Sequence, residues 1–568
     1  MFVKTTRVRR GNKVYEYLSL VEAVRDGDRT GHRTLVRLGE VTALRSSGQL
    51  ERIVAALEAH LERERVDVNG LVAEDAPAVG GIAAVWSVWQ QLGLDVWFAK
   101  AGAERGAEVL EHACFAMVAN RLIGACSKRR LGEWTSADVV MPAGWETPSL
   151  DQYYRALDAV AATKEPTEQH LYSRLCDLTN LDLRLVCYDL TSTYFEGASR
   201  PSVRFPSRVF GYSRDKRPDR PQVVIGLLCT SDGIPIAHHV FAGNTADVST
   251  LPGVLDDLAA RFGVGRVCVV ADRGLISVDN VAELSDRGYA HLLATRLHRD
   301  PTCAAALTQA AAAPDAHWAE VPGTDLTACE TTVDGQRCVV VDSPQRQERD
   351  TLRTVELVAR TEAQLLALER RVRDGRLVDA GKIGRACQRI LGPSGVARLF
   401  DVEIGPARFV FHYHDDAFAY ETLLAGRYVL ATSLTPTEAT TAQVVRAYRQ
   451  LIEVEHRFRI LKDFLHLRPV RHWTESRVRG HIAVCVYASI LEALITRALT
   501  AADVRDPDRH DQHLTAERAL REAARVRAVT LTTGSRVINR VTRRTPLQAR
   551  VLRALEVDTG TWDRATIA

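Results

Sequence analysis

The order of apolar segments between Leu181 and Arg296 constrains the fold of this chain more than any other feature. In order, the segments are LDLRLVCYD, QVVIGLLCT, IPIAHHVFA, STLPGVLDDLAARFG, RVCVVA, SVDNVAELSDRG and YAHLLATR. The pattern predicts three strands, a helix, a strand, a helix and a last strand. The second and third strands flank the turn Ser231-Asp232-Gly233 and should form a hairpin. The later strand-helix-strand units imply right-handed crossovers and parallel pairing.

A mixed five-stranded sheet of this order matches the ribonuclease H-like fold, so we expect an α/β protein. Between residues 297 and 434 the pattern changes to short strand-like pieces around a charged helical stretch near Glu356 to Arg376. We interpret this segment as a β-rich insertion placed before the final helix of the core.

The 568 residues are too many for one hydrophobic core, and three or four domains are expected. FVKTTRVRR and VYEYLSLV flank the turn Gly11-Asn12 and predict a basic β-hairpin. From Leu50 to Asp177 the patterns are helical, and either a DNA-binding region or a bundle with solvated charges fits them. The predicted regions are 1–48 (basic β-unit), 49–178 (helical, DNA-binding), 179–296 (core), 297–434 (insertion), 435–500 (core, last part) and 501–568 (helical).

Composition excludes several classes of protein but does not identify a partner. The chain has 74 basic and 71 acidic side chains, so a nucleic-acid surface would have to be local. Its 11 cysteines include no CxxC pair, which makes zinc an unfavoured ligand and suits free thiols in the cytosol. The longest apolar run, IAVCVYASIL, is about half the length of a membrane span and predicts a buried helix.

Two aspartates occupy corresponding places in the predicted sheet. Asp189 is expected to end the first strand and Asp272 the fourth, and these strands should be neighbours. Their carboxylates would then lie about 4.8 Å apart, one strand spacing. Two carboxylates this close stay ionised only with a cation between them, which predicts Mg²⁺ or Mn²⁺.

A third ligand is expected from the helical segment YRQLIEVEHRFRILKDFLHLRP, where two glutamates compete. At about 100° per residue, Glu455 falls near Tyr448 and Lys462 beside the apolar stripe, whereas Glu453 points toward solvent. Glu455 is therefore the preferred third acid. Each acid alone is more simply a turn, cap or salt-bridge residue, and only their joint placement favours a metal site.

Four motifs together resemble the DDE-class transposases of bacterial insertion sequences. They are YDLTSTYFEG, the GNTAD of Gly243 to Asp247, VVADRGLIS, and a Tyr, Glu and Lys spaced seven apart with FRILK. The resemblance covers residues 180–300 and 425–490. It points to the subgroup whose catalytic glutamate sits in a Tyr-Arg-Glu-Lys signature, after a β-rich insertion.

The resemblance implies roles for individual residues. Asp189, Asp272 and Glu455 match the metal-binding acids, which hold two Mg²⁺ or Mn²⁺ ions in the family. Tyr448 and Lys462 match side chains that contact DNA. The signature arginine is Leu451 here, and Arg449 or Arg459 could make its phosphate contact instead.

The resemblance also implies double-stranded DNA, at the element ends and the target, as substrate. Strand cleavage and strand transfer would take place on a homodimer in the bacterial cytoplasm, at the nucleoid and without a membrane. Trp473 could stack on an unpaired base or pack at a helix junction. The arginines around it are expected to contact phosphates: Arg468, Arg471, Arg477 and Arg479.

Two other functions fit parts of this pattern. A ribonuclease H-like nuclease without strand transfer would need neither the insertion nor the large N-terminal region. A domesticated DNA-binding protein need not keep all three acids, which are present here. Metal-dependent cleavage and salt-dependent DNA binding, measured side by side, separate these alternatives.

Overall fold

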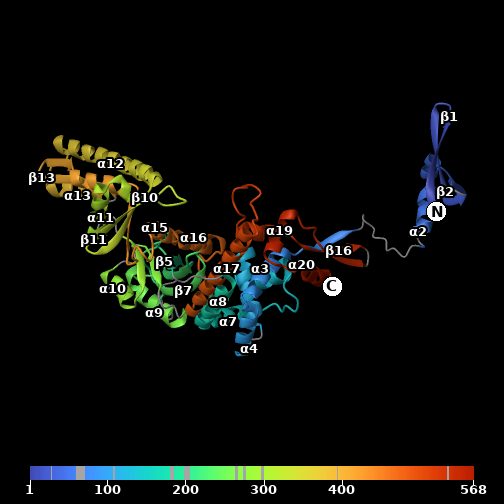
Figure 1. The fold of residues 1–568 in the computed structure, drawn as a ribbon, viewed down its shortest axis with the longest axis horizontal. Coiled ribbons are helices and arrows are strands. Elements are labelled where there is room, and N and C mark those ends of the chain that lie inside the picture. The colour runs from blue at the N-terminus through green and yellow to red at the C-terminus, as the bar shows by residue number, and fades with distance from the viewer. Residues whose placement is uncertain are drawn as a thin grey trace. The chain divides into compact units, whose positions relative to one another are not determined.

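The computed structural model describes residues 1–26, 29–58, 60, 71–105, 109–179, 185–197, 205–262, 267–272, 275, 277–295, 298, 300–392, 395–533 and 536–567 (Figure 1). The chain forms two compact units. One comprises Met1–Glu74 with Leu531–Ile538, and the other comprises Asp75–Thr530 with Asn539–Ala568.

The N-terminal unit is built on a three-stranded antiparallel sheet in the order β1-β2-β3. The predicted hairpin is confirmed, with Gly11 at φ 61° in its turn. The third strand was not predicted, because its sequence RTGHRTLVRLGE lacks an apolar alternation. The elements are β1 (Phe2–Arg10), β2 (Lys13–Asp26), β3 (Arg29–Glu40), α1 (Val41–Ser46) and α2 (Gln49–Glu58). Residues 59 and 61–65 of the predicted helix VAALEAHLERER lie outside the described residues.

The core of the larger unit is a mixed sheet with the order β10-β11-β12-β15-β9-β8-β5-β6-β7. β5 pairs in parallel with β8, and β8 with β9, whereas β5-β6 and β6-β7 are antiparallel. The predicted hairpin and both parallel crossovers are therefore confirmed. The strands and crossover helices are β5 (Leu185–Tyr194), β6 (Gln222–Thr230), β7 (Pro235–Ala242), η3 (Asp247–Ser249), α9 (Leu251–Phe262), β8 (Cys268–Ala271), α10 (Val278–Asp286) and β9 (Ala290–Ala294). Residues 181–184 of the predicted first strand lie outside the described residues.

The predicted number of five strands is wrong, because four strands of the insertion extend the sheet to nine. β15 pairs antiparallel with β9, with Leu430 opposite Ala294. An uncovered β9 would expose a row of unpaired backbone groups, and β15 satisfies them. The added strands are β10 (Trp318–Glu320), β11 (Thr327–Val333), β12 (Gln336–Asp342) and β15 (Arg427–Thr432).

The insertion contains more helix than its predicted β-rich character implies. The predicted charged helix is confirmed, and at 30 residues it is the longest of the described helices. It packs with the β13-β14 hairpin around Leu365, Ile383 and Phe400 (Figure 1). The elements are α11 (Pro301–Ala312), η5 (Asp315–His317), α12 (Pro344–Arg373), α13 (Ala380–Leu391), η6 (Ala397–Leu399), β13 (Phe400–Gly405), β14 (Arg408–Tyr413) and α14 (Asp415–Leu424).

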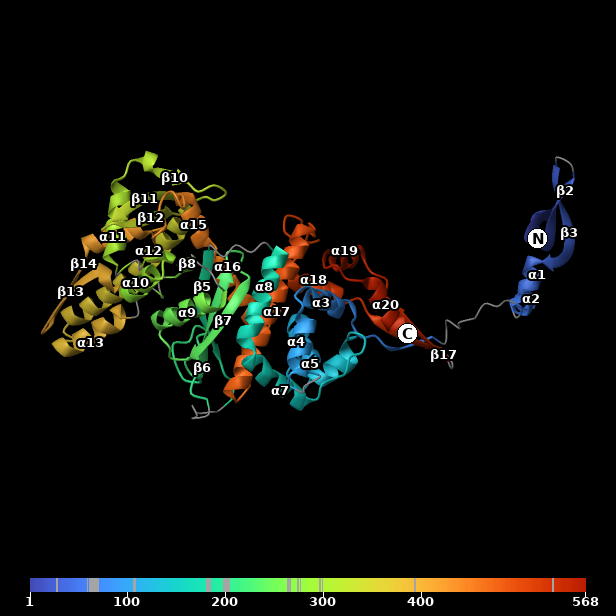
Figure 2. The ribbon, with the colours of Figure 1, turned by 60° about the horizontal axis from the view of Figure 1, so that its bottom comes forward.

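A bundle of helices packs around α17 (Glu475–Ala501), which carries the apolar run IAVCVYASIL. This helix is long and apolar enough to span a membrane, but 78% of its most apolar window is buried inside the fold, so the predicted buried helix is confirmed. α8 and α17 contact β7 (Figure 2). The other helices are α3 (Gly80–Gln91), α4 (Leu94–Ala103), α5 (Leu110–Ile123), α6 (Leu131–Glu133), η2 (Trp134–Asp138), α7 (Leu150–Ala162) and α8 (Lys164–Thr179).

The C-terminal region was predicted to be helical, but it also contains two strands. The arginine-rich segment VINRVTRR was expected to continue a helix and instead contributes β17, since its β-branched Val and Ile residues suit a strand. These strands form a sheet in the order β17-β16-β4. The elements are β4 (Val72–Asp75), α18 (Ala516–Ala523), β16 (Ala528–Thr533), β17 (Arg536–Val541), α19 (Pro546–Ala554) and α20 (Thr559–Ile567).

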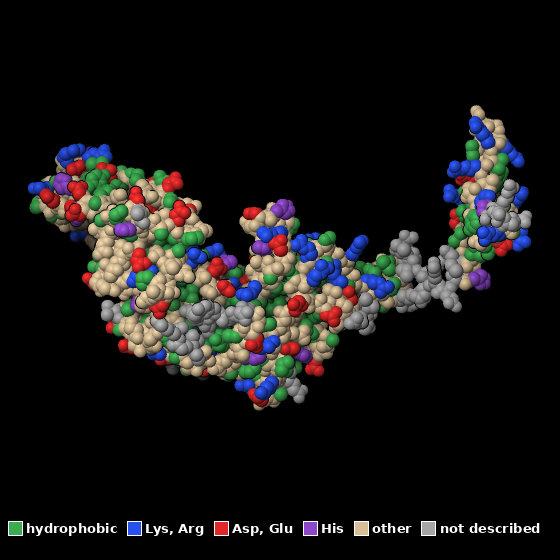
Figure 3. Space-filling model, in the orientation of Figure 1, with side chains coloured by type: hydrophobic (Ala, Val, Ile, Leu, Met, Phe, Trp, Pro, Cys, Tyr) green, Lys and Arg blue, Asp and Glu red, His purple; other side chains and the backbone are tan. Residues whose placement is uncertain are grey.

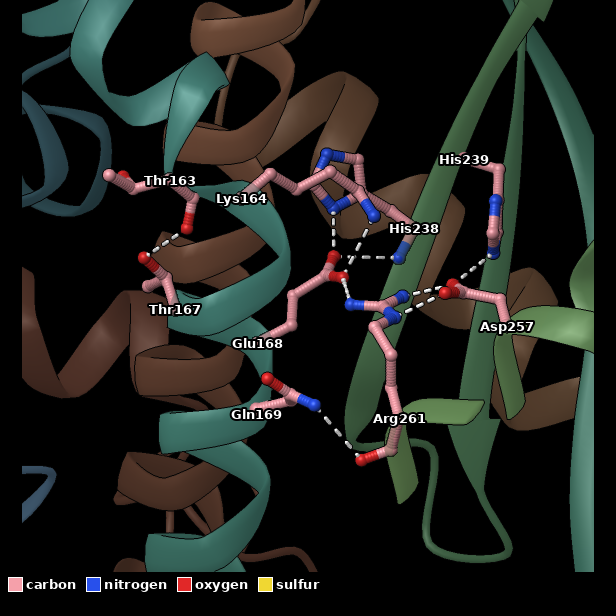
Figure 4. Close-up of polar contacts among 9 residues, drawn as sticks. All are labelled: Thr163, Lys164, Thr167, Glu168, Gln169, His238, His239, Asp257 and Arg261. Atoms are coloured by element: carbon pink, nitrogen blue, oxygen red, sulfur yellow. Dashed lines mark hydrogen bonds and ion pairs between the residues drawn. The ribbon is translucent and has the colours of Figure 1, made fainter. Parts of the chain in front are cut away.

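A buried ion network joins α8 to β7 and α9 (Figure 4). The Glu168 carboxylate, 2% exposed, lies 2.6 Å from Arg261 Nη1, 2.8 Å from Lys164 Nζ and 2.7 Å from His238 Nδ1. Arg261 also binds Asp257, whose Oδ2 lies 3.2 Å from His239 Nε2. Burial raises the pKa of Glu168, but His238, Lys164 and Arg261 outweigh burial and lower it to about 2. The carboxylate is therefore ionised, and it ties the helical bundle to the sheet.

Candidate active site

The sheet register places Asp189 and Asp272 side by side. β5 continues to Tyr194, so the prediction that Asp189 ends its strand is wrong: the hydroxyl residues after it pair with β6. The strand that ends at this level is β8, the parallel neighbour of β5. Its last residue, Ala271, lies opposite Tyr188. Asp272 follows directly, at the next position along the register. The two aspartates are thus neighbours across one strand spacing, about 4.8 Å.

The alternation of side chains along β5 determines the face of the sheet on which Asp189 lies. Tyr188 packs into the core beneath α9 and α10, whereas Cys187 packs into the core formed with α16 and α17. Because successive side chains of a strand point to opposite faces, Asp189 lies on the same face as Cys187. That is the face on which α16 (Leu451–Arg459) contacts β5.

The pKa values show that Glu455 of α16 shares this location. Burial raises the pKa of Asp189 to about 7, and the charges of Asp272 and Glu455 contribute to the increase. The pKa of Glu455 is likewise raised, first by burial and then by Asp272, while Arg459 opposes the shift. The three carboxylates are therefore close enough to repel one another. In the described part of the chain, no three His, Cys, Asp or Glu side chains are grouped so as to hold one ion.

Glu453 lies on another side of the same helix. A Cβ atom on Gly233, in the turn between β6 and β7, would be 2.9 Å from Glu453 Cβ. The Glu453 side chain is 49% exposed, and its carboxylate is 4.0 Å from His456 Nδ1. This places Glu453 at the hairpin turn, apart from the two aspartates.

The helix predicted over residues 448–469 is not continuous. α15 (Thr441–Arg449) ends before Gln450, α16 follows, and Ile460–Phe464 form a π-helical turn, η7. In that turn Leu465 N donates to Ile460 O, five residues back, which buries Leu461 and Leu465 together. The prediction that Tyr448, Glu455 and Lys462 share one helical stripe assumed a constant rotation of about 100° per residue. It is therefore wrong, because Tyr448 lies on α15 and Lys462 lies in η7, outside α16.

Tyr448 and Lys462 occupy different surroundings. The Tyr448 ring lies 5.8 Å from that of Tyr428 on β15. Lys462 Nζ lies 2.8 Å from Asp215 Oδ1. Burial lowers the pKa of Lys462, and Asp215 partly offsets this effect.

A charged loop that the sequence pattern did not single out lies beside the acids. Asp215, 2% exposed, binds both Lys462 and Arg468. Arg214 donates to both Asp247 oxygens at 2.6 Å, and its charge lowers the pKa of Asp189. The loop thus connects the GNTAD motif with FRILK, although its sequence SRDKR has only an unspecific charge pattern.

The other predicted DNA-contacting residues differ in exposure. Arg477 and Arg479 are half-buried and pair with Asp158 and Glu475. Arg459 and Arg471 are exposed. Trp473 is 59% exposed and lies against Arg208, whose guanidinium carbon is 5.0 Å from the ring centroid. Arg208, itself buried, also covers the Phe195 ring at 4.5 Å. The exposed indole is thus held by a buried arginine.

Two family models match the chain. Residues 3–70 match the N-terminal domain of IS1634 family transposases, and residues 181–491 match the transposase DDE domain. No curated protein matches by sequence.

The matched families account for the architecture and the activity. The DDE domain has a ribonuclease H-like fold, which agrees with the mixed sheet, and its members use divalent metal ions. Such enzymes cleave DNA strands and transfer them to a target. Since the DDE domain model alone covers more than half of the residues, the chain belongs to the DDE-class insertion-sequence transposases.

Proposed function

We propose that Asp189, Asp272 and Glu455 are the catalytic acids of this transposase and bind two Mg²⁺ or Mn²⁺ ions. What supports this is the sheet register, which makes Asp189 and Asp272 neighbours across one strand spacing, together with the charge of Glu455, which adds to burial in raising the pKa of Asp189. Like charges held together in a partly buried place need a cation to remain ionised. Carboxylate oxygens are also the ligands that these hard ions prefer.

The bound ions supply Lewis-acid stabilisation of the attacking and leaving oxygens. Water attacks the phosphorus at the element end, the bond to O3′ breaks, and a 3′-hydroxyl is released. That hydroxyl then attacks a phosphodiester of the target DNA, forming a new P–O3′ bond as the target strand breaks. The protein's part is positioning: Arg214 fixes the GNTAD loop through Asp247, and Asp215 fixes Lys462 beside the acids.

We also propose that the subgroup is the one with the Tyr-Arg-Glu-Lys signature. Tyr448, Lys462, Arg459, Arg471 and Trp473 would contact double-stranded DNA, with Arg459 in place of the arginine missing at Leu451. Pairing of two element ends requires two active sites, which favours a homodimer on DNA.

Recognition of the element end fits residues 1–175. Every residue of β1, FVKTTRVRR, is exposed, and Lys and Arg side chains lie at several places on the face of the N-terminal unit seen in Figure 3, among acidic and apolar ones. Basic side chains on exposed strands contact phosphates and position a duplex. A truncated protein that begins at Asp75 should therefore lose its preference for the element end.

Glu455→Gln and its neighbour Glu453→Gln form a matched pair that tests the choice of the third acid. Both changes remove one charge from α16, but only Glu455 raises the pKa of Asp189. We expect Glu455→Gln to lower the rate of Mg²⁺-dependent cleavage of an end duplex about 10³-fold. Glu453→Gln should stay within about threefold of wild type. Equal losses in both variants would contradict the assignment.

A further inference from the structure

A basic cavity of about 480 Å³ lies between the helical bundle and the segment that follows the catalytic glutamate. One wall is formed by the end of α5 and residues 125–129, and the other by residues 466–472 with His481 of α17. Among the residues that the structure describes, no carboxylate lines it. Its cationic lining residues are Arg121, Lys128, Arg129, Arg468 and Arg471.

Lys128 is the central residue of this cavity. It is 6% exposed, and among the described residues no hydrogen bond or ion pair to its ammonium group is present. Burial lowers its pKa to about 7, and the charge of Arg121 adds to the effect. A buried cation without an anion destabilises the fold, so such a group needs a functional or structural reason.

Arg121 strengthens the positive field and has no acidic partner either. It is 6% exposed and donates to the main-chain carbonyl oxygens of Cys126 and His466, so it closes the wall of the cavity. Its Nε lacks a hydrogen-bond partner among the described residues. Burial, with the charges of Lys128 and Arg121, lowers the pKa of His472 to about 4 and that of His481 well below its usual range. Lys128 and Arg121 therefore face neutral imidazoles, and the acid that acts on His472, Asp158, is not part of the cavity lining.

The cavity is connected to the candidate active site through one ion-paired residue. Arg468 lines the cavity and binds Asp215, the carboxylate that also holds Lys462. A DNA strand that contacts Lys462 would therefore pass the mouth of the cavity. Arg471, exposed at that mouth, is available as a second contact.

We propose that this cavity binds a phosphate group of the DNA strand, with Lys128 as the buried ligand and Arg471 at the mouth. The inference rests on the proposed function, because DNA is then the polyanion presented to this face. Phosphate contacts from lysine and arginine position a duplex without reading its sequence. The bound phosphate would neutralise the cation that the fold leaves uncompensated.

The test compares Lys128→Met with Lys100→Met, which removes an exposed lysine of α4 from the same bundle. Binding of a duplex carrying the gene's flanking inverted repeat is measured by fluorescence anisotropy over a series of salt concentrations, with Ca²⁺ present. For Lys128→Met we expect affinity to fall about 10-fold and the slope of log K against log salt to decrease by about 0.9, one phosphate contact. Lys100→Met should match wild type.

Thermal unfolding provides a second measurement. Without DNA, Lys128→Met should unfold at a higher temperature than wild type, because it removes an uncompensated buried charge. Inorganic phosphate should raise the unfolding temperature of wild type, relative to chloride at equal ionic strength, but not that of Lys128→Met. If only the duplex stabilises wild type, the site takes a strand phosphate and not the free ion.

An unchanged affinity and salt slope in a stably folded Lys128→Met would overturn the proposal. If wild type itself fails to bind the inverted repeat, the proposed function fails as well, so the two failures are distinguishable. Alkylation gives a local check: Cys126 lines the cavity, and Cys176 is the other half-buried cysteine. DNA should protect Cys126 but not Cys176 from iodoacetamide, and equal reaction of Cys126 with and without DNA would count against the site.

Discussion

Asp189→Asn and Asp272→Asn should each abolish Mg²⁺-dependent cleavage of an end duplex. The rate is expected to fall about 10³-fold or more, because losing a metal ligand removes several kcal/mol of transition-state stabilisation. DNA binding should stay within about threefold of wild type, since neither residue is expected to contact phosphate directly. Single-turnover cleavage and anisotropy binding on the same preparations measure the two quantities.

Asp286→Asn is the matched control for both variants. Asp286 ends α10, is exposed, and lies apart from the β5–β8 register that joins the two acids. Its cleavage rate should equal that of wild type. Cleavage by Asp189→Asn or Asp272→Asn at a near-normal rate would refute the assignment of the acids. Loss of DNA binding in step with cleavage would instead indicate a folding defect.

Glu168→Gln should cause the largest loss of stability among single isosteric changes in the ion network of Figure 4. The amide keeps the shape of the side chain and can still accept from His238 N, but it leaves Arg261 and Lys164 without one of their anions. Breaking a buried pair costs about 3–5 kcal/mol. Urea unfolding should show a loss of this size in the free energy of unfolding, with a lower midpoint.

Glu165→Gln, one residue after Lys164 on α8, is the control for this change. Glu165 is exposed, so its replacement should alter the free energy of unfolding by less than about 0.5 kcal/mol. If the two variants unfold at the same urea concentration, the network does not join the bundle to the sheet energetically.

The same residue predicts a pH dependence of stability. The pKa of Glu168 is about 2 in the folded protein and 4.5 in a solvated side chain. Because the folded pKa is lower, the contribution of Glu168 is fully present above about pH 4.5 and is lost as the pH falls toward 2. The difference in unfolding free energy between wild type and Glu168→Gln should therefore shrink by about 2 kcal/mol between pH 6 and pH 3, as measured by urea titration.

The catalytic sheet could be predicted because its strands are coded by local patterns. Each apolar run is short and bounded by a turn, and the order of runs and helices leaves few ways to pair them. The pairing of Asp189 with Asp272 follows from that order, even though β5 continues past Asp189. The four added strands were assigned to an insertion, because only the long-range pairing of β15 with β9 reveals that they continue the same sheet.

Residues held by long-range contacts could not be found from the sequence. Asp215 is an ordinary loop acid until Lys462 and Arg468 close on it from segments about 250 positions later in the chain. Lys128 belongs to a visible basic run, but no periodicity shows that this residue is buried in a cavity lined by other cations. The π-helical turn is also invisible to a helical wheel, which assumes a constant rotation per residue.

A crystal structure of the transposase with Mn²⁺ and an inverted-repeat duplex, with anomalous diffraction recorded at the manganese edge, tests the central claim most directly. We predict two anomalous peaks about 3.5–4 Å apart, with carboxylate oxygens of Asp189 and Asp272 in direct coordination and Glu455 completing the set. Peaks that avoid both aspartates, or that are coordinated by Glu453 in place of Glu455, would contradict it.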